Sequence, residues 1–176
     1  MPDFFEGGTA DISWYPPTNE EQVQLLQQFL HTKTALPPAF SKIFDIVQGG
    51  NMYAIGGTYE SWSILGLCWG GKIATLCAGS NDGLFKAAVQ CHPAMLDVND
   101  AERVNVPFVC LVSKDEPADD VRAFMAKLRV PNHVQIFCTE VHGWMAARAD
   151  LEHPEVSREY ERGYRTVLEF FGRHAK

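Results

Sequence analysis

The residues best suited to chemistry in this chain lie in three short segments. Cys68 lies in Gly66-Leu67-Cys68-Trp69-Gly70-Gly71, directly after a short apolar run. The segments Lys114-Asp115-Glu116 and Val141-His142-Gly143-Trp144 each follow a later apolar run. A thiol, a carboxylate and an imidazole in this chain order can form a nucleophilic site. In such a site the imidazole takes the thiol proton and the carboxylate holds the imidazole.

The segment around Cys68 has the composition of a nucleophile elbow, a sharp turn between a strand and a helix. Small residues on both sides of Cys68 allow the strand and the helix to approach closely. A thiol at the start of a helix also lies near the positive end of the helix dipole, which favours the thiolate. We therefore predict Cys68 as a nucleophile, against the alternative of a buried structural cysteine. The backbone N–H of Trp69 is the predicted oxyanion donor.

Asp115 and His142 are the predicted partners of Cys68. His142 serves as the general base, and Asp115 fixes the imidazole tautomer, with Glu116 as an alternative acid. Taken singly, an acid after a strand is usually a turn residue, and a histidine beside glycine is usually a solvated loop residue. The order of nucleophile, acid and histidine at successive strand ends favours a site instead.

Apolar patterning elsewhere predicts strands that alternate with helices. Strands are expected up to Leu65 and over 87–91, 106–113 and 134–138. Helices are expected over 72–79, over 119–129 with Asp119 or Asp120 as the cap, and over 155–174. Such a pattern forms a parallel sheet whose catalytic groups lie beyond the carboxyl ends of the strands. The predicted fold class is α/β, a parallel sheet flanked by helices, in a single domain over residues 1–176.

The chain before the elbow is expected to hold two helices and several loops. Thr18 and Glu21 form a predicted capping box for a helix that ends near His31. A second helix is expected over 40–47, after the break at Pro37-Pro38. The glycine pairs at 49–50 and 56–57 lack the spacing of a phosphate-binding loop, so we interpret this segment as an ordinary loop.

Composition and charge exclude several classes of protein. The 176 residues are 46% hydrophobic with a net charge of −7, which suits a globular domain and disfavours nucleic-acid binding. The sequence shows no apolar stretch of membrane-spanning length and no signal peptide. Five cysteines without C-x-x-C pairs indicate reduced thiols and a cytoplasmic location. Three histidines lack the spacing of metal ligands, so no metal is expected: His92, His133 and His153.

Together, these segments resemble the dienelactone hydrolase family, and the tail over 158–172 resembles its fungal members. The resemblance is carried by five segments: Pro2-Asp3-Phe4-Phe5, 66–72, Cys91-His92-Pro93, 113–117 and 141–144. It implies an α/β-hydrolase fold and a cysteine that opens lactones or esters without cofactor or metal. In this resemblance Cys68, Asp115 and His142 match the nucleophile, the acid and the base.

The resemblance further implies a shortened form of the family's fold. Family members carry strands before the Asp-Phe-Phe segment, with a loop that gives a second oxyanion N–H, whereas Met1 lies almost at that segment here. The elbow strand is then expected at a bare sheet edge, and we expect a homodimer to cover it. Phe4, Trp144 and Arg148 are the expected substrate-binding residues. Arg148 is displaced from the position of one family arginine, and Glu6 stands where the other is expected.

Hydrolysis of a small-molecule ester or lactone through an acyl-enzyme is the predicted function. One oxyanion donor contributes about 2.7–4 kcal/mol, so hydrolysis should be slower by about two to three decades unless another group replaces the absent N–H. One alternative is an isomerase, cyclase or lyase of a biosynthetic pathway that uses His142 as a general acid/base. The other is a non-catalytic binding or assembly subunit.

Overall fold

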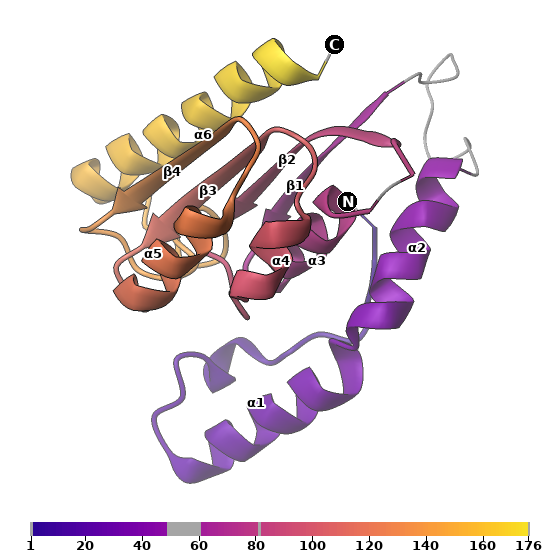
Figure 1. Cartoon of the computed structure of the whole chain (residues 1–176). Coiled ribbons are helices and arrows are strands. Elements are labelled where there is room, and N and C mark those ends of the chain that lie inside the picture. Colours follow the sequence, from indigo (N-terminus) through magenta and orange to yellow (C-terminus); the bar gives the residue numbers. More distant parts are fainter. Residues whose placement is uncertain (1, 49–60, 81, 176) are drawn as a thin grey trace, which may run out of the picture. The chain divides into compact units, whose positions relative to one another are not determined.

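The computed structural model describes residues 2–48, 61–80 and 82–175 (Figure 1). The chain divides into two compact units, Met1–Gly49 and Gly50–Lys176, and each is described by itself. The single domain over residues 1–176 therefore stays a prediction. The glycine-rich loop expected over 49–57 lies outside the described residues.

The second unit is built on four strands in the order β1-β2-β3-β4, all parallel. The strands are β1 (Trp62–Leu67), β2 (Phe85–Cys91), β3 (Phe108–Ser113) and β4 (Asn132–Phe137). The helices are α3 (Trp69–Ala78), α4 (Val98–Arg103), α5 (Ala118–Lys127) and α6 (Pro154–His174). This confirms the predicted α/β fold, a parallel sheet flanked by helices.

Helices lie on both faces of the sheet (Figure 1), and an apolar layer fills the space on each face. Helices α3, α4 and α5 cover one face, where Ala88 and Phe108 pack with Phe124. Helix α6 covers the other face, where Ala87 packs with Val167. Successive side chains of a strand point to opposite faces, so neighbouring residues such as Ala87 and Ala88 enter different layers. Because β2 and β3 are buried on both faces, they form a rigid base for the loops at their carboxyl ends.

Strand β1 lies at one edge of the sheet formed by the described residues, as expected for the elbow strand. Helix α4, between β2 and β3, was not predicted. Helix α5 has Pro117 at its cap position and no side-chain cap, so the predicted cap at Asp119 or Asp120 is wrong. No helix among the described residues combines the length and the apolar character needed to cross a membrane.

The first unit contains a 3-10 turn (Ile12–Trp14) and the helices α1 (Glu20–Lys33) and α2 (Leu36–Gln48). The predicted cap is shifted by one residue, because Asn19 accepts a hydrogen bond from the N–H of Gln22 at 2.9 Å. Gln22 in turn accepts from the N–H of Thr18 at 2.7 Å. Helix α2 begins at Leu36 rather than near residue 40, because prolines are tolerated in the first turn of a helix.

The described cysteines are all free. Burial raises the pKa of the Cys77 and Cys110 thiols to about 12, and it raises the pKa of Cys91 still further. These three thiols are therefore neutral core groups at physiological pH. Cys138 was expected to end the strand predicted over 134–138 and to be a core thiol, like Cys91 and Cys110 in their own strands. It instead follows β4 and is exposed.

The elbow depends on glycine at position 66, where β1 passes close to α3. A Cβ on Gly66 would lie 1.9 Å from the carbonyl oxygen of Gly70, a distance that no side chain tolerates. A Cβ on Gly70 would meet nothing within 4 Å. The two glycines therefore form a matched pair in the same turn.

We expect Gly66→Ala to lower the free energy of unfolding by about 3 kcal/mol or more, because the clash is with backbone. The control Gly70→Ala should keep or raise it by about 0.5–1 kcal/mol, since alanine favours a helix over glycine. Urea unfolding followed by circular dichroism measures both. Equal stability of Gly66→Ala and wild type would contradict the close approach.

Candidate active site

Cys68 lies on a strained turn between β1 and α3. Its backbone angles are φ 55° and ψ −119°, a conformation that L residues rarely adopt and that costs about 1–3 kcal/mol. The Cys68 N–H donates to the carbonyl of Cys91 at 3.1 Å. The Cys68 carbonyl accepts from the N–H groups of Gly71 at 2.9 Å and Ala94 at 3.1 Å. These bonds hold the side chain at the tip of the turn, which is the geometry of a nucleophile elbow.

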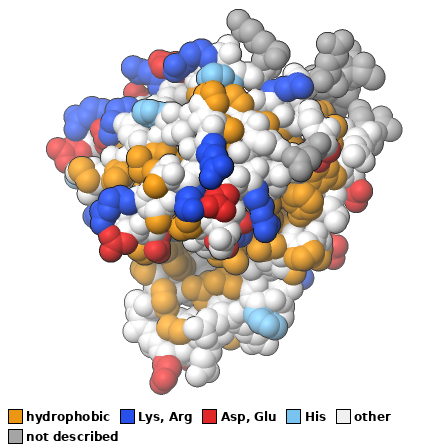
Figure 2. All heavy atoms as spheres, viewed as in Figure 1, with side chains coloured by type: hydrophobic (Ala, Val, Ile, Leu, Met, Phe, Trp, Pro, Cys, Tyr) orange, Lys and Arg blue, Asp and Glu red, His pale blue; other side chains and the backbone are white. Residues whose placement is uncertain are grey.

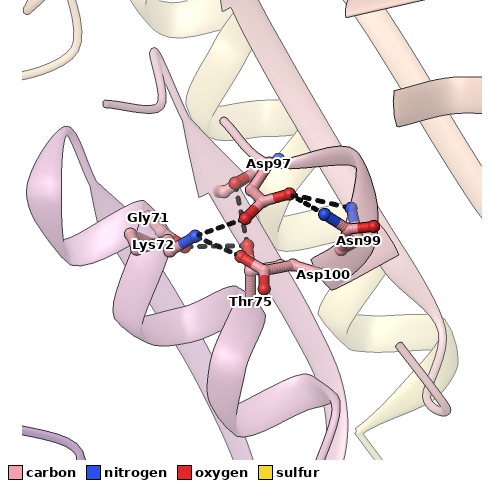
Figure 3. Close-up of polar contacts among 7 residues, drawn as sticks. Gly71, Lys72, Thr75, Asp97, Asn99 and Asp100 are labelled. Atoms are coloured by element: carbon pink, nitrogen blue, oxygen red, sulfur yellow. Dashed lines mark hydrogen bonds and ion pairs between the residues drawn. The ribbon is translucent and has the colours of Figure 1, made fainter. Parts of the chain in front are cut away.

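A buried polar cluster braces the helix behind Cys68 (Figure 3). The ammonium of Lys72 in α3 pairs with Asp100 of α4 and lies 3.8 Å from the carboxylate of Asp97. The Thr75 hydroxyl donates to the carbonyl of Gly71 at 2.9 Å and to Gln90 of β2 at 2.8 Å. Loss of one partner of a buried ion pair costs about 3–5 kcal/mol, so this cluster fixes the first turns of α3.

His142 lies in the loop after β4, and its ring contacts two predicted site residues. Its Nδ1 lies 2.7 Å from Oε1 of Glu116. A carboxylate only accepts hydrogen bonds, so Nδ1 carries a proton and Nε2 is the nitrogen left to serve a thiol. Hydrogen bonding to Cys68, and next to Glu116, raises the pKa of His142 to about 9, although burial acts in the opposite direction. The structure thus brings Cys68, His142 and Glu116 together.

The carboxylate at the His142 ring is that of Glu116, the alternative acid, whereas Asp115 was predicted. Glu116 is buried, and its Oε2 accepts the N–H of Ser113 at 2.5 Å. Asp115 is exposed, and its Oδ2 accepts the backbone N–H of His142 at 2.8 Å. The turn after β3 directs these neighbouring side chains differently. Asp115 therefore holds the loop backbone, and Glu116 orients the ring.

Arg148, a predicted substrate-binding residue, holds the His142 loop in this structure. Its Nη1 donates to the carbonyl of His142 at 3.1 Å. Its side-chain carbons pack over Gly143, where an added Cβ would lie 3.3 Å from them and where φ is +93°. This contact supports the loop that carries the imidazole. A role of Arg148 in substrate binding stays a prediction.

Trp144 was predicted to line the substrate pocket, but its side chain is fully buried in the core. Its ring centroid lies 4.3 Å from that of Phe137. Helix α6 passes close to this ring, because a Cβ on Gly163 would lie 2.5 Å from it. Trp144 therefore packs the loop against α6, and a role of Trp144 in substrate binding stays a prediction.

The roles predicted for Trp69 and Phe4 stay predictions. Trp69 is the first residue of α3, directly after Cys68, the position from which its N–H could serve an oxyanion. Phe4 lies in the first unit, where the Lys42 ammonium is 5.9 Å from its ring centroid. Among the described residues, no group of three or more His, Cys, Asp or Glu side chains could hold a metal ion.

Sequence reasoning gave no role in the site to His92, which follows β2. Its ring is fully buried and packs edge-to-face against His142, with ring centroids 5.2 Å apart. The available signal was its position, since His92 follows a strand that ends at the same sheet edge as the other site residues. Proximity to His142 could not be read from the sequence, because it depends on a loop some 50 residues away.

An elbow at the carboxyl edge of a parallel sheet, with an imidazole and a carboxylate from later loops, defines an α/β-hydrolase-like protein. The sequence profile described as the dienelactone hydrolase family matches residues 2–175. The chain belongs to this family, as its motifs predicted.

Two relatives in Schizosaccharomyces pombe, both described as uncharacterized AIM2 family proteins, are 31% and 32% identical to this chain over 176 residues. Each alignment covers 97% of this chain and 69% of the relative. Among solved structures, dienelactone hydrolase from Anabaena variabilis has a TM-score of 0.62 at 15% identity, over 90% of this chain and 69% of that chain. A dienelactone hydrolase-like promiscuous phosphotriesterase from metagenomic libraries has a TM-score of 0.63 at 16% identity, over 88% and 68%. These two likenesses show the fold.

We expect Glu116→Gln to lower the pKa of His142 by about one unit or more, because it removes a negative charge at Nδ1. Asp115→Asn is the matched control and should change this pKa less, since Asp115 contacts the backbone. Titration of the His142 ring by NMR measures both. A larger effect of Asp115→Asn would restore Asp115 as the acid.

The same raised pKa makes stability depend on pH. The pKa of histidine is near 6.5 in the unfolded chain, whereas that of folded His142 is about 9. Between these values the folded His142 ring holds a proton that the unfolded ring has lost, so the contribution of this ring to stability is present below pH 6.5 and is lost as the pH rises toward 9. Urea unfolding across this range should show a smaller loss for Glu116→Gln than for wild type.

Proposed function

We propose that this protein hydrolyses small-molecule esters or lactones through a covalent intermediate on Cys68. His142 is the acid/base, Glu116 is the acid that orients it, and Asp115 holds the His142 backbone. The carrying observation is the 2.7 Å contact between Nδ1 of His142 and the carboxylate of Glu116. The raised pKa of His142, whose first cause is hydrogen bonding to Cys68, supports it. A base with two such partners fits nucleophilic catalysis better than a solvated loop histidine does.

The first half-reaction begins from a thiolate of Cys68 paired with the imidazolium of His142. The sulfur attacks the substrate carbonyl carbon, and the carbonyl electron pair moves to oxygen, next to the proposed N–H donor of Trp69. When the intermediate collapses, the C–O bond to the leaving group breaks and His142 gives its proton to the departing oxygen. The product of this step is a thioester on Cys68.

The second half-reaction uses the same residues in reverse. His142, now neutral, takes a proton from water, which attacks the thioester carbonyl. The C–S bond breaks, the acid product leaves, and the thiolate–imidazolium pair is restored. Glu116 stabilises the charged ring in both halves, so its loss should slow acylation and deacylation together.

Loss of the thiol should abolish covalent labelling. We expect the wild type to gain one acetyl group from para-nitrophenyl acetate in intact-mass spectra, and Cys68→Ala to gain none. Cys138→Ala is the matched control, because Cys138 is also a free, accessible thiol. Labelling that persists in Cys68→Ala and disappears in Cys138→Ala would overturn the proposal.

The same variants separate the alternative functions once a natural substrate is in hand. Turnover that survives Cys68→Ala but not His142→Ala would indicate an isomerase, cyclase or lyase that uses acid/base chemistry alone. Turnover or ligand binding that neither change affects would indicate a binding or assembly subunit. Loss with either change supports nucleophilic hydrolysis.

We also propose a homodimer that covers β1. Among the described strands β1 lies at the sheet edge, and Leu65 within it is exposed. An edge strand with apolar side chains favours pairing with another chain. Light scattering at micromolar concentration should then give about twice the mass of one chain, and a monomer would contradict the proposal.

On the face that Figure 2 shows, basic side chains lie beside acidic ones, in keeping with a small-molecule rather than a nucleic-acid partner.

A further inference from the structure

His92 has a side chain and a backbone conformation that both lower the stability of the fold. Its side chain is fully buried, and neither ring nitrogen has a hydrogen-bond partner among the described residues. Its backbone has φ 35°, which is uncommon for a residue other than glycine. A buried polar group without a partner and a strained backbone both destabilise the fold, and such features gather at functional sites.

The backbone around His92 is tied to the elbow. The Cys91 carbonyl accepts the N–H of Cys68 at 3.1 Å, and the Ala94 N–H donates to the Cys68 carbonyl at 3.1 Å. The N–H of His92 itself donates to the carbonyl of Leu111 in β3 at 2.6 Å. The backbone at His92 is thus fixed relative to Cys68 by hydrogen bonds on both sides.

The ring of His92 packs against the ring of His142. The two planes meet at 67° with centroids 5.2 Å apart, the edge-to-face arrangement that ring pairs prefer. Nδ1 of His142 donates to Glu116, and His92 adds a third contact, at the side of the same ring. We propose that His92 is a positioning residue, whose ring holds His142 between Cys68 and Glu116; this role rests on the proposed function.

The charge state of His92 suits this role. Burial, and next the charge of His142, lower the pKa of His92 to about 4, while Glu116 acts in the opposite direction. A neutral ring can pack beside the imidazolium of His142, whereas a second cation at this distance would repel it. Histidine also tolerates positive φ better than most side chains do. A histidine at position 92 can therefore adopt the positive φ of the backbone and also supply a small neutral ring.

Two variants distinguish the effect of the His92 ring from the effect of its nitrogens. His92→Ala removes the ring contact, and His92→Phe keeps an aromatic ring without nitrogens. We expect His92→Ala to slow acetylation of Cys68 by para-nitrophenyl acetate by about 10- to 100-fold, the cost of a misplaced catalytic group. It should also move the pKa of His142 from about 9 toward its ordinary value. His92→Phe should recover most of both losses.

The control is His133→Ala, which removes an exposed histidine at the start of β4. Circular dichroism and urea unfolding show whether each variant is folded. A folded His92→Ala with wild-type acetylation and a wild-type pKa of His142 overturns the proposal. If His92→Ala does not fold, His92→Phe decides, because a folded Phe variant with an ordinary His142 pKa also overturns it. If the wild type is not acetylated, the proposed function fails, yet the His142 titration still tests the role of His92.

Discussion

The hydrogen bond between Nδ1 of His142 and the buried carboxylate of Glu116 determines how the rest of the site can work. It assigns the proton to Nδ1 and thereby leaves Nε2 for Cys68. It also stabilises the charged ring, which is one cause of the raised pKa of His142. Without this bond the imidazole could rotate, and neither its tautomer nor its charge would be fixed.

The sheet makes this contact possible by fixing the three loops that meet at it. Strands β2 and β3 are packed on both faces, so their carboxyl ends hardly move relative to one another. Backbone bonds then link Cys68 to the end of β2 and the loop that follows it. The loop after β3 is linked to the loop after β4 by the bond from Lys114 N–H to the carbonyl of Glu140 at 3.0 Å. A packed sheet of this kind offsets the strained backbone at Cys68 and His92, which a mobile loop could not maintain.

The features of the fold that could be predicted from the sequence are those decided by local steric requirements. The elbow could be found because Gly66 must lack a side chain where β1 meets α3, and that requirement is visible as a glycine spacing. The parallel sheet followed from short apolar runs separated by helical segments. Helix α4 was missed because it has six residues, too few to show a helical period.

The choice between Asp115 and Glu116 could not be predicted, because both follow β3 and both are carboxylates. A one-residue difference in the turn decides which side chain enters the interior, and that turn is set by contacts with the β4 loop. The burial of Trp144 could not be predicted for a related reason, because it depends on the close approach of Gly163 in α6 to the Trp144 ring.

A parallel sheet places the ends of its strands at one edge, but it does not choose the residue that follows each strand. Distant proteins with 15–16% identity therefore share this fold and need not share the residues that follow its strands. In this chain the deciding contacts are side-chain ones, from Glu116 and His92 to the ring of His142. Glu116 is buried, so little water screens its carboxylate, and it has a larger effect on the charge of the ring than the same group would have in solvent.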